Sequence, residues 1–361
     1  MLNLSFLDIV NVCDNTRVHR PSPVPSVYDA ELLVPLYLSE SSDSPVIGLL
    51  RPVVLDQLVL ENQRSRELGL QELWALNVVE ATYIPRKNKS IGPSVSFHSW
   101  VDTHIKRTAA MKELCERWRD TLVFEDVCGP KKWRAELYPI YTDPLGIHDY
   151  PNDAITNQAL NFVFEIERSA CALFGFITYG VHMSIYEEVE VDDKKSLKVW
   201  VPTRARTKQT FPGLLDNTVA GGIPSGMSIF ESMVKECMEE ASIPDHVVRK
   251  YARTVGAISY FYRTPKGWLQ PEVEYVYDIR MPHDVDSKIF EPRPLDGEVE
   301  SFELLTCTQV VQKIRAGLFK PNCALVLIDL FIRLGYITPE TEPDYMKIIT
   351  RLHGTFDLER W

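Results

Sequence analysis

The sequence contains no long hydrophobic run. None of its segments approaches the roughly 18 consecutive apolar residues that a membrane-spanning helix needs, so we expect no membrane partner. Residues 1–15 carry Asp8 and Asp14 and no basic cluster, and a secretory signal peptide is therefore not expected.

Paired cysteines are absent as well. The seven cysteines are scattered, odd in number and never spaced as Cys-x-x-Cys, which disfavours both a disulfide framework and a zinc ribbon. Unpaired thiols are typical of reducing compartments. We therefore expect a cytoplasmic protein, and an organelle stays open.

Positive charge is scarce. Lys and Arg number 39 against 50 Asp and Glu, which gives a formal net charge of −11. Binding to a nucleic-acid backbone needs clustered basic residues, so nucleic acid is not expected as a partner. A local basic patch remains compatible with a small diphosphate.

The turn-forming residues of segment 141–157 predict a boundary between two domains. We expect an N-terminal α+β domain of unknown role over 1–150 and a second domain over 158–345. The first has strand-like and helical patterns at 30–38, 46–50, 53–62 and 101–122. The second has expected strands at 198–202, 254–263, 273–279 and 301–305, and expected helices at 308–316 and 322–334.

A glycine-rich turn leads into a glutamate-rich helix. Gly221 and Gly222 precede a helical pattern in which Glu236, Glu239 and Glu240 follow the spacing i, i+3 and i+4. Side chains at this spacing share one helix face. Such a cluster is usually a solvated surface, but the preceding glycines favour a different interpretation. Like charges this close repel, so the pattern indicates a site for a hard divalent metal.

The ends of this helix are also marked. Ser228 and Glu231 have the spacing of a capping box, which predicts the start. The helix is expected to end near Ser242, just before Pro244. Cys237 falls on the apolar stripe, and we expect it to be buried.

Two other features are expected to be structural. His98 and His182 are isolated, and a lone histidine is more often a packed core residue than a catalytic one. No sequence neighbour supplies either with a base partner. Glu274, in the strand expected at 273–279, is also interpreted as structural.

The glycine turn and the helix resemble the Nudix box, Gly-x5-Glu-x7-Arg-Glu-U-x-Glu-Glu-x-Gly-U, where U is a bulky apolar residue. The matching positions are Gly221, Glu236, Cys237, Glu239, Glu240 and Ile243. The departures are Met227 for Glu, Lys235 for Arg and Ser242 for Gly. In the family the first Glu and the Arg brace the loop, so that brace is lost or rebuilt here, with Glu231 as a candidate.

Segments 200–222, 270–278, 296–302 and 319–323 are similar to a fungal and plant Nudix subgroup related to the Nudix half of thiamine pyrophosphokinase fusions. The resemblance implies a Nudix α/β/α sandwich with a mixed sheet, preceded by a smaller α+β domain. It also implies hydrolysis of a diphosphate to a monophosphate and phosphate with Mg²⁺ or Mn²⁺. The implied substrates are thiamine-type diphosphates, above all oxo- and oxythiamine diphosphate.

The resemblance and the charge pattern together assign candidate site residues. Glu236 and Glu240 are expected to bind the metal, with Glu239 as a further ligand or the group that orients the attacking water. Glu236 and Glu239 are the catalytic candidates, and which glutamate is the base stays open. The expected substrate-binding residues are Arg204, Arg206, Lys208, Gly221 and Gly222, and the candidates for an extra ligand or base are Glu298 and Glu300.

Two other functions remain open. One is a non-catalytic diphosphate-binding module, because the box departs from its consensus. The other is an enzyme similar to isopentenyl diphosphate isomerase, which needs a catalytic cysteine. The expected partner in each case is a small-molecule diphosphate, and a homodimer is also open.

Overall fold

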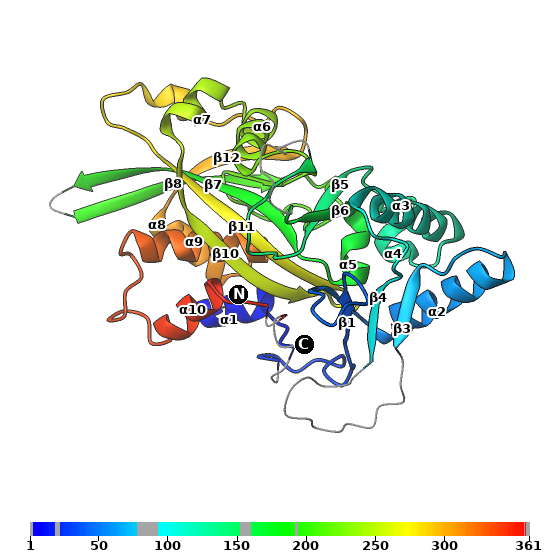
Figure 1. Ribbon diagram of the computed structural model, residues 1–361. Helices are drawn as coiled ribbons and strands as arrows, with labels where there is room; N and C mark the ends of the chain where they lie inside the picture. Colours follow the sequence, from blue (N-terminus) through cyan, green and yellow to red (C-terminus); the bar gives the residue numbers. More distant parts are fainter. Residues whose placement is uncertain are drawn as a thin grey trace.

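The computed structural model describes residues 3–18, 22–77, 93–151, 160–191, 194–356 and 358 (Figure 1). Of the segment expected to separate two domains, 141–157, residues 152–157 lie outside the described residues. The division into 1–150 and 158–345 therefore stays a prediction. In the described part of the chain, no helix is long and apolar enough to cross a membrane.

A six-stranded mixed sheet forms the centre of the molecule. Its strand order is β10-β11-β7-β8-β12, and β9 also pairs with β7. The bounds are β7 Thr178–Val191, β8 Lys194–Arg204, β9 Val219–Gly222, β10 Arg253–Arg263, β11 Leu269–Arg280 and β12 Val299–Thr306. Only the pairing of β11 with β7 is parallel. β9 pairs with residues 180–183 of β7 and β8 with residues 186–191, so the two share one edge of β7.

Helices cover both faces of this sheet (Figure 1). One layer contains α6 Ile229–Ala241 and α7 Asp245–Tyr251. The other contains α1 Phe6–Cys13, α8 Cys307–Arg315, α9 Pro321–Arg333 and α10 Tyr345–Leu352. Alternate side chains of β7 point to opposite faces, and Val181, Met183 and Ile185 accordingly pack in the core under α6. The predicted α/β class with a mixed sheet is confirmed.

A smaller α+β layer lies beside the main sheet. Its four-stranded sheet has the order β2-β1-β4-β3, and β5 pairs separately with β6. The strands are β1 Val34–Tyr37, β2 Val46–Leu50, β3 Trp74–Asn77, β4 Ser94–Phe97, β5 Leu137–Tyr141 and β6 Phe162–Glu167. The helices are α2 Pro52–Glu67, α3 His104–Thr121, α4 Glu125–Cys128 and α5 Cys171–Phe174. These elements share one apolar core, which includes Trp74, Trp118 and Phe174.

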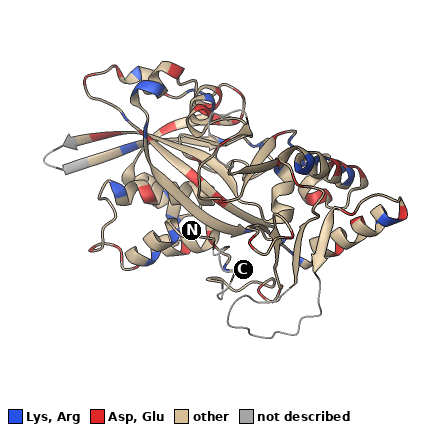
Figure 2. Cartoon of the chain, in the orientation of Figure 1, with Lys and Arg blue, Asp and Glu red and all other residues tan. Residues whose placement is uncertain are grey.

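Charged residues lie mainly on the helices and loops, with acidic and basic side chains interspersed (Figure 2). The main sheet also carries charged residues, and the buried Glu274 and Asp278 of β11 have hydrogen-bond partners, as burial of a charge requires. All seven cysteines are free, and six are buried.

Gly48 provides a test of the packing between β2 and the segment around α5. A Cβ atom here would overlap the Phe174 carbonyl oxygen and lie 2.8 Å from Phe176 Cδ1. Overpacking of this kind costs about 1–3 kcal/mol, so Gly48→Ala should lower the free energy of unfolding by that amount in urea titration. Gly354→Ala is the matched control, because its Cβ would meet only ordinary contacts at 3.7 Å. Equal stability of the two variants would contradict the tight packing.

Candidate functional site

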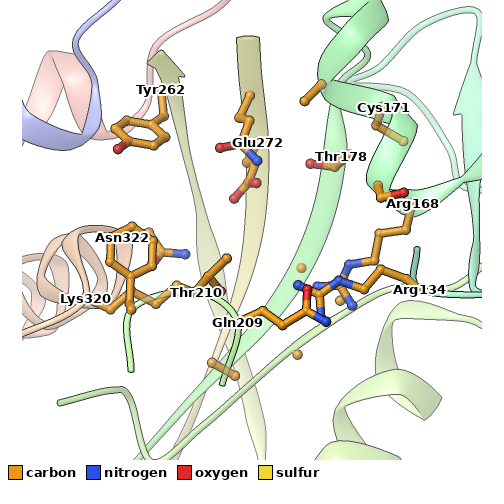
Figure 3. A pocket seen from close by; sticks show the side chains of 18 of the residues that line it. Arg134, Arg168, Cys171, Thr178, Gln209, Thr210, Tyr262, Glu272, Lys320 and Asn322 are labelled. Carbon is orange, nitrogen blue, oxygen red and sulfur yellow. The ribbon is translucent and has the colours of Figure 1, made fainter. Parts of the chain in front are cut away.

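A cavity of about 580 Å³ opens between the main sheet, α6 and the smaller α+β layer. Its walls include the three glutamates of α6 and the glycines of β9. The segments around β5 and β6 contribute Arg134 and Arg168, and β11 contributes Glu272 (Figure 3). The cavity therefore joins residues that lie more than one hundred positions apart in the sequence.

The position of α6 follows from its cap and its apolar stripe. The Ser228 side chain accepts a hydrogen bond from the Glu231 backbone N–H, which satisfies one free donor of the first turn. Met233 and Cys237 are buried under the helix. The reciprocal half of the expected capping box is not made, because the Glu231 carboxylate instead pairs with Arg249 at 2.7 and 2.8 Å.

The three glutamates of α6 differ in exposure. The side chains of Glu236 and Glu240 are 16% and 8% exposed, whereas that of Glu239 is 48% exposed. The Glu240 carboxylate accepts a hydrogen bond from the Ala220 backbone N–H at 3.2 Å. The helix therefore presents two sheltered carboxylates and one open carboxylate to the same cavity.

Gly221 and Gly222 make room for side chains on opposite faces of β9. A Cβ on Gly221 would overlap the Glu236 carboxylate, and one on Gly222 would overlap the Tyr138 hydroxyl. Successive residues of a strand face opposite sides. The end of β9 is thus flanked by the acidic helix on one side and by Tyr138 on the other. Both glycines line the cavity, and their contact with a substrate stays a prediction.

Burial and neighbouring negative charge hold Glu240 partly protonated near neutrality. Burial raises the pKa of Glu240 to about 7, with a further rise from Asp216 and an opposing effect of Lys208. Burial also raises the pKa of Glu236. Both carboxylates therefore lack sufficient compensating charge, and this favours the binding of either a proton or a cation.

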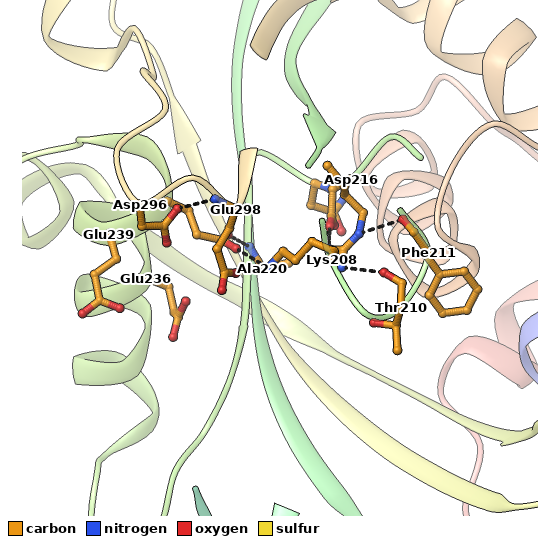
Figure 4. Close-up of polar contacts among 12 residues, drawn as sticks. Lys208, Thr210, Phe211, Asp216, Ala220, Glu236, Glu239, Asp296 and Glu298 are labelled. Carbon is orange, nitrogen blue, oxygen red and sulfur yellow. Dashed lines mark hydrogen bonds and ion pairs between the residues drawn. The ribbon is translucent and has the colours of Figure 1, made fainter. Parts of the chain in front are cut away.

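Two lysines supply part of the compensating charge, and one of them, Lys208, lies beside Glu298 in Figure 4. Lys235 Nζ lies 3.4 Å from Glu236 and 2.8 Å from Glu239. Lys208 Nζ lies 3.6 Å from Glu240 and also pairs with Glu298. Lys235, which stands at the arginine position of the Nudix box, thus pairs with the glutamates themselves.

The predicted basic residues are not gathered into one group. Arg204 is buried and pairs with Asp216, and it donates further hydrogen bonds to the backbone oxygens of Thr210 and Phe211 at 3.1 and 3.2 Å. The Arg206 side chain is 86% exposed, faces Glu300 at 3.6 Å and does not line the cavity.

Lys208 and Arg204 do line the cavity, and so does Glu298, whereas Glu300 does not. The structure therefore brings Glu298 and Lys208 to the acidic helix, whereas the pair formed by Arg206 and Glu300 lies outside the cavity.

A buried polar network at the far end of the cavity was not expected from the sequence. Glu272 and Glu274 lie two residues apart on β11, so their side chains share a face. The Tyr260 hydroxyl lies within hydrogen-bonding distance of both carboxylates and can donate its one hydrogen to only one of them at a time, and Asn322 donates to Glu274 at 3.0 Å. Burial, followed by the charge of Glu274, raises the pKa of Glu272 to about 7. The spacing of two residues between Glu272 and Glu274 on one strand is the pattern from which the sequence could have predicted this pair.

His182 belongs to the same network. It is buried, as expected, but the expectation that it lacks an acidic partner is wrong: its Nε2 lies 3.4 Å from Glu274, and its Nδ1 lies 2.7 Å from Asn217 Oδ1. β7 and β11 are parallel neighbours, so these distant residues become adjacent. His98, by contrast, is not in a core: its side chain is 34% exposed and pairs with Glu40 at 3.1 Å.

These features define an α/β/α protein whose acidic helix and glycine strand open into a polar cavity. The family model described as NUDIX domain matches residues 189–323, which contain strands β8 to β12 and helices α6, α7 and α8. The chain therefore contains a Nudix domain, and the resemblance seen in the sequence is confirmed.

Several known proteins are similar to this chain. An uncharacterized protein of Saccharomyces cerevisiae, YJR142W, is 39% identical over 62% of this chain and 62% of its own length. Nudix hydrolase 20, chloroplastic, of Arabidopsis thaliana is 42% identical over 53% of this chain and 48% of its own length. The chain thus spans about half to three fifths of the length of these curated relatives. Among solved structures, DR0079 of Deinococcus radiodurans is 22% identical with a TM-score of 0.34, over 46% of this chain and 90% of that one.

The raised pKa of Glu240 predicts a pH-dependent stability in metal-free buffer. The unfolded carboxyl titrates near 4.5 and the folded one near 7, so the folded state binds more protons between these values. Stability is therefore lost as pH rises through this window. Glu240→Gln removes that loss, and its free energy of unfolding in urea and EDTA should exceed that of the wild type by about 2–3 kcal/mol at pH 8 but much less at pH 5.

Glu239→Gln is the control for this experiment, because its half-exposed carboxylate should change stability by less than about 1 kcal/mol at either pH. A difference between wild type and Glu240→Gln that is the same at pH 5 and pH 8 would show that Glu240 is not protonated on folding.

Proposed function

We propose that this protein is a metal-dependent Nudix pyrophosphohydrolase that cleaves a diphosphate to a monophosphate and phosphate. The observation that carries the proposal is the pair of sheltered carboxylates, Glu236 and Glu240, which face a cavity of about 580 Å³ without sufficient compensating charge. The Nudix domain and the relatives named Nudix hydrolase support the same reaction class.

The glutamates of α6 fit a hard cation in their donor chemistry. Within the described residues, no three His, Cys, Asp or Glu side chains converge closely enough to hold a metal. Yet Glu236, Glu239 and Glu240 all line the cavity, and carboxylate oxygens are the ligands that Mg²⁺ and Mn²⁺ prefer. These three residues would hold the ion, with Glu298 as a further candidate. When bound, such an ion neutralises diphosphate oxygens and polarises the phosphorus centre.

The residues of the chain then have distinct roles. A water oxygen attacks phosphorus, the bridging P–O bond breaks, and the proton of the water passes to a carboxylate. Glu239 is open enough to orient that water, whereas Glu240 is held in place by the Ala220 N–H. Lys208 and Lys235 lie at the same carboxylates and can move to phosphate oxygens as the charge there changes.

We propose thiamine-type diphosphates, including oxo- and oxythiamine diphosphate, as the substrates. This part rests on the subgroup that the sequence resembles. It is supported by aromatic residues of the cavity, Phe211, Tyr260, Tyr262 and Trp268, since such rings stack on a heteroaromatic substrate. The cytoplasmic location and the homodimer stay predictions, and the two Arabidopsis relatives are named chloroplastic.

The isomerase alternative is disfavoured by Cys237. This thiol is fully buried, its Sγ contacts Met233 Sδ at 3.5 Å, and burial raises its pKa. A thiol in this state is a poor catalytic group. The binding-module alternative has one supporting observation, which is that Lys235 and Lys208 already pair with the glutamates.

The reaction is tested by phosphate release with Mg²⁺ from thiamine, oxythiamine, nucleoside and nucleotide-sugar diphosphates. Glu236→Gln and Glu240→Gln should each lower kcat by about 100-fold or more, the scale expected for loss of a catalytic carboxylate. Glu113→Gln is the control, because Glu113 is an exposed residue of α3, 74% exposed, that pairs with Arg117. It should retain full activity.

The alternatives give different results in the same assay. Binding of a diphosphate without phosphate release by the wild type would favour the binding module, and an isomerised product without phosphate would favour the isomerase. Full activity of both glutamine variants would contradict the assigned site.

A further inference from the structure

Two arginines from outside the matched Nudix segment line the cavity beside β9. Arg134 precedes β5 and Arg168 follows β6, and the two guanidinium groups lie together in Figure 3. The pKa of Arg134 is lowered by burial and then by the charge of Arg168. Two cations held this close repel, so the arrangement favours an anion between them or beside them.

Arg168 is held in position by its neighbours. Its Nη1 donates to Glu136 Oε2 at 2.8 Å, and its Cζ lies 4.9 Å from the centroid of the Tyr138 ring. Its Cζ also lies 3.4 Å from the position that a Cβ on Gly222 would take. The guanidinium is therefore fixed against one face of β9, and its remaining N–H groups are available to a ligand.

Arg134 has no side-chain partner among the residues that the structure describes. Its backbone N–H donates to Glu167 Oε1 at 2.8 Å, which fixes the main chain. The guanidinium itself makes no described hydrogen bond or ion pair, although it lines the cavity. A free guanidinium next to a second one is suited to bidentate contact with phosphate oxygens.

The acidic helix lies close enough to share a ligand with these arginines. Glu236 covers Gly221, and Arg168 lies over the next residue, Gly222. The positive charge of Arg168 also acts to lower the pKa of Glu236, against the larger rise caused by burial. A diphosphate at the end of β9 can therefore meet the carboxylate side and the arginine side at once.

The basic residues expected from the sequence do not fill this role. Arg204 is engaged with Asp216 and two backbone oxygens, and Arg206 points away from the cavity. Lys208 is paired with Glu240 and Glu298. Compared with these three residues and with Arg168, Arg134 has the most side-chain donors without a described partner.

We propose that Arg134 and Arg168 bind the phosphate groups of the diphosphate, so that the segments around β5 and β6 complete the site of the Nudix domain. The identity of the anion rests on the proposed hydrolase function. The contact is one of binding and orientation: the arginines hold phosphate oxygens while the glutamates of α6 act at the phosphorus.

The test combines kinetics with direct binding of methylenediphosphonate, a diphosphate analogue that cannot be hydrolysed at its bridge. Arg134→Gln loses no described contact, so it should fold normally and raise KM by about 10-fold, which corresponds to about 1.4 kcal/mol. Arg134→Gln/Arg168→Gln should raise KM further and weaken analogue binding in calorimetry with Mg²⁺ by at least that factor. Arg168→Lys keeps the positive charge but not the planar guanidinium, so it should raise KM less than Arg168→Gln does.

Arg66→Gln is the matched control, because Arg66 is a half-exposed residue of α2 that pairs with Glu72 at 3.0 Å. It should leave KM and analogue binding unchanged. If the wild type binds the analogue but releases no phosphate from any of the diphosphates, the proposed reaction is overturned and the arginine site still stands. Absence of analogue binding by the wild type, or equal binding by the wild type and the double variant, would overturn the arginine site.

Discussion

The contact between α6 and the end of β9 is the constraint on which the rest of the site depends. The apolar stripe of α6 packs on the main sheet through Met233 and Cys237, and this fixes the direction of the opposite face. Gly221 has no Cβ, so the Glu236 carboxylate can lie against the strand. The same packing leaves Glu240 buried beside the Ala220 N–H. Hydrophobic burial thus holds two carboxylates where water compensates them poorly.

Charge balance around these carboxylates depends on one lysine of α6 and on one lysine from another part of the chain. Lys208 arrives from the loop after β8 and Lys235 from α6 itself. Neither removes the excess of negative charge, as the raised pKa of Glu240 indicates. The uncompensated charge of these carboxylates lowers the free energy of unfolding, and a bound cation would remove that unfavourable interaction.

The smaller α+β layer has its own apolar core and also contributes residues to the wall of the cavity. Tyr138 and Arg168 meet β9 at Gly222, on the face opposite the acidic helix. At the other end, Glu272 and Glu274 form a buried network with Tyr260 and Asn322. The cavity therefore has acidic residues on α6 and on β11, and two arginines from the segments around β5 and β6. This distribution is suited to a ligand with an anionic part and a polar ring.

The sequence by itself determined the match to a Nudix domain and most of the elements. The spacing of Glu236, Glu239 and Glu240 and the glycines before them are local patterns, and α6 forms where its cap and apolar stripe place it. Local patterns also located β10, β11, α8 and α9 within a few residues. Only the tertiary structure decided which charges meet. Arg204 became a buried partner of Asp216, His182 met Glu274 across parallel strands, and Arg134 reached the cavity from a distant segment. These outcomes depend on contacts between positions far apart in the chain, which no local spacing encodes.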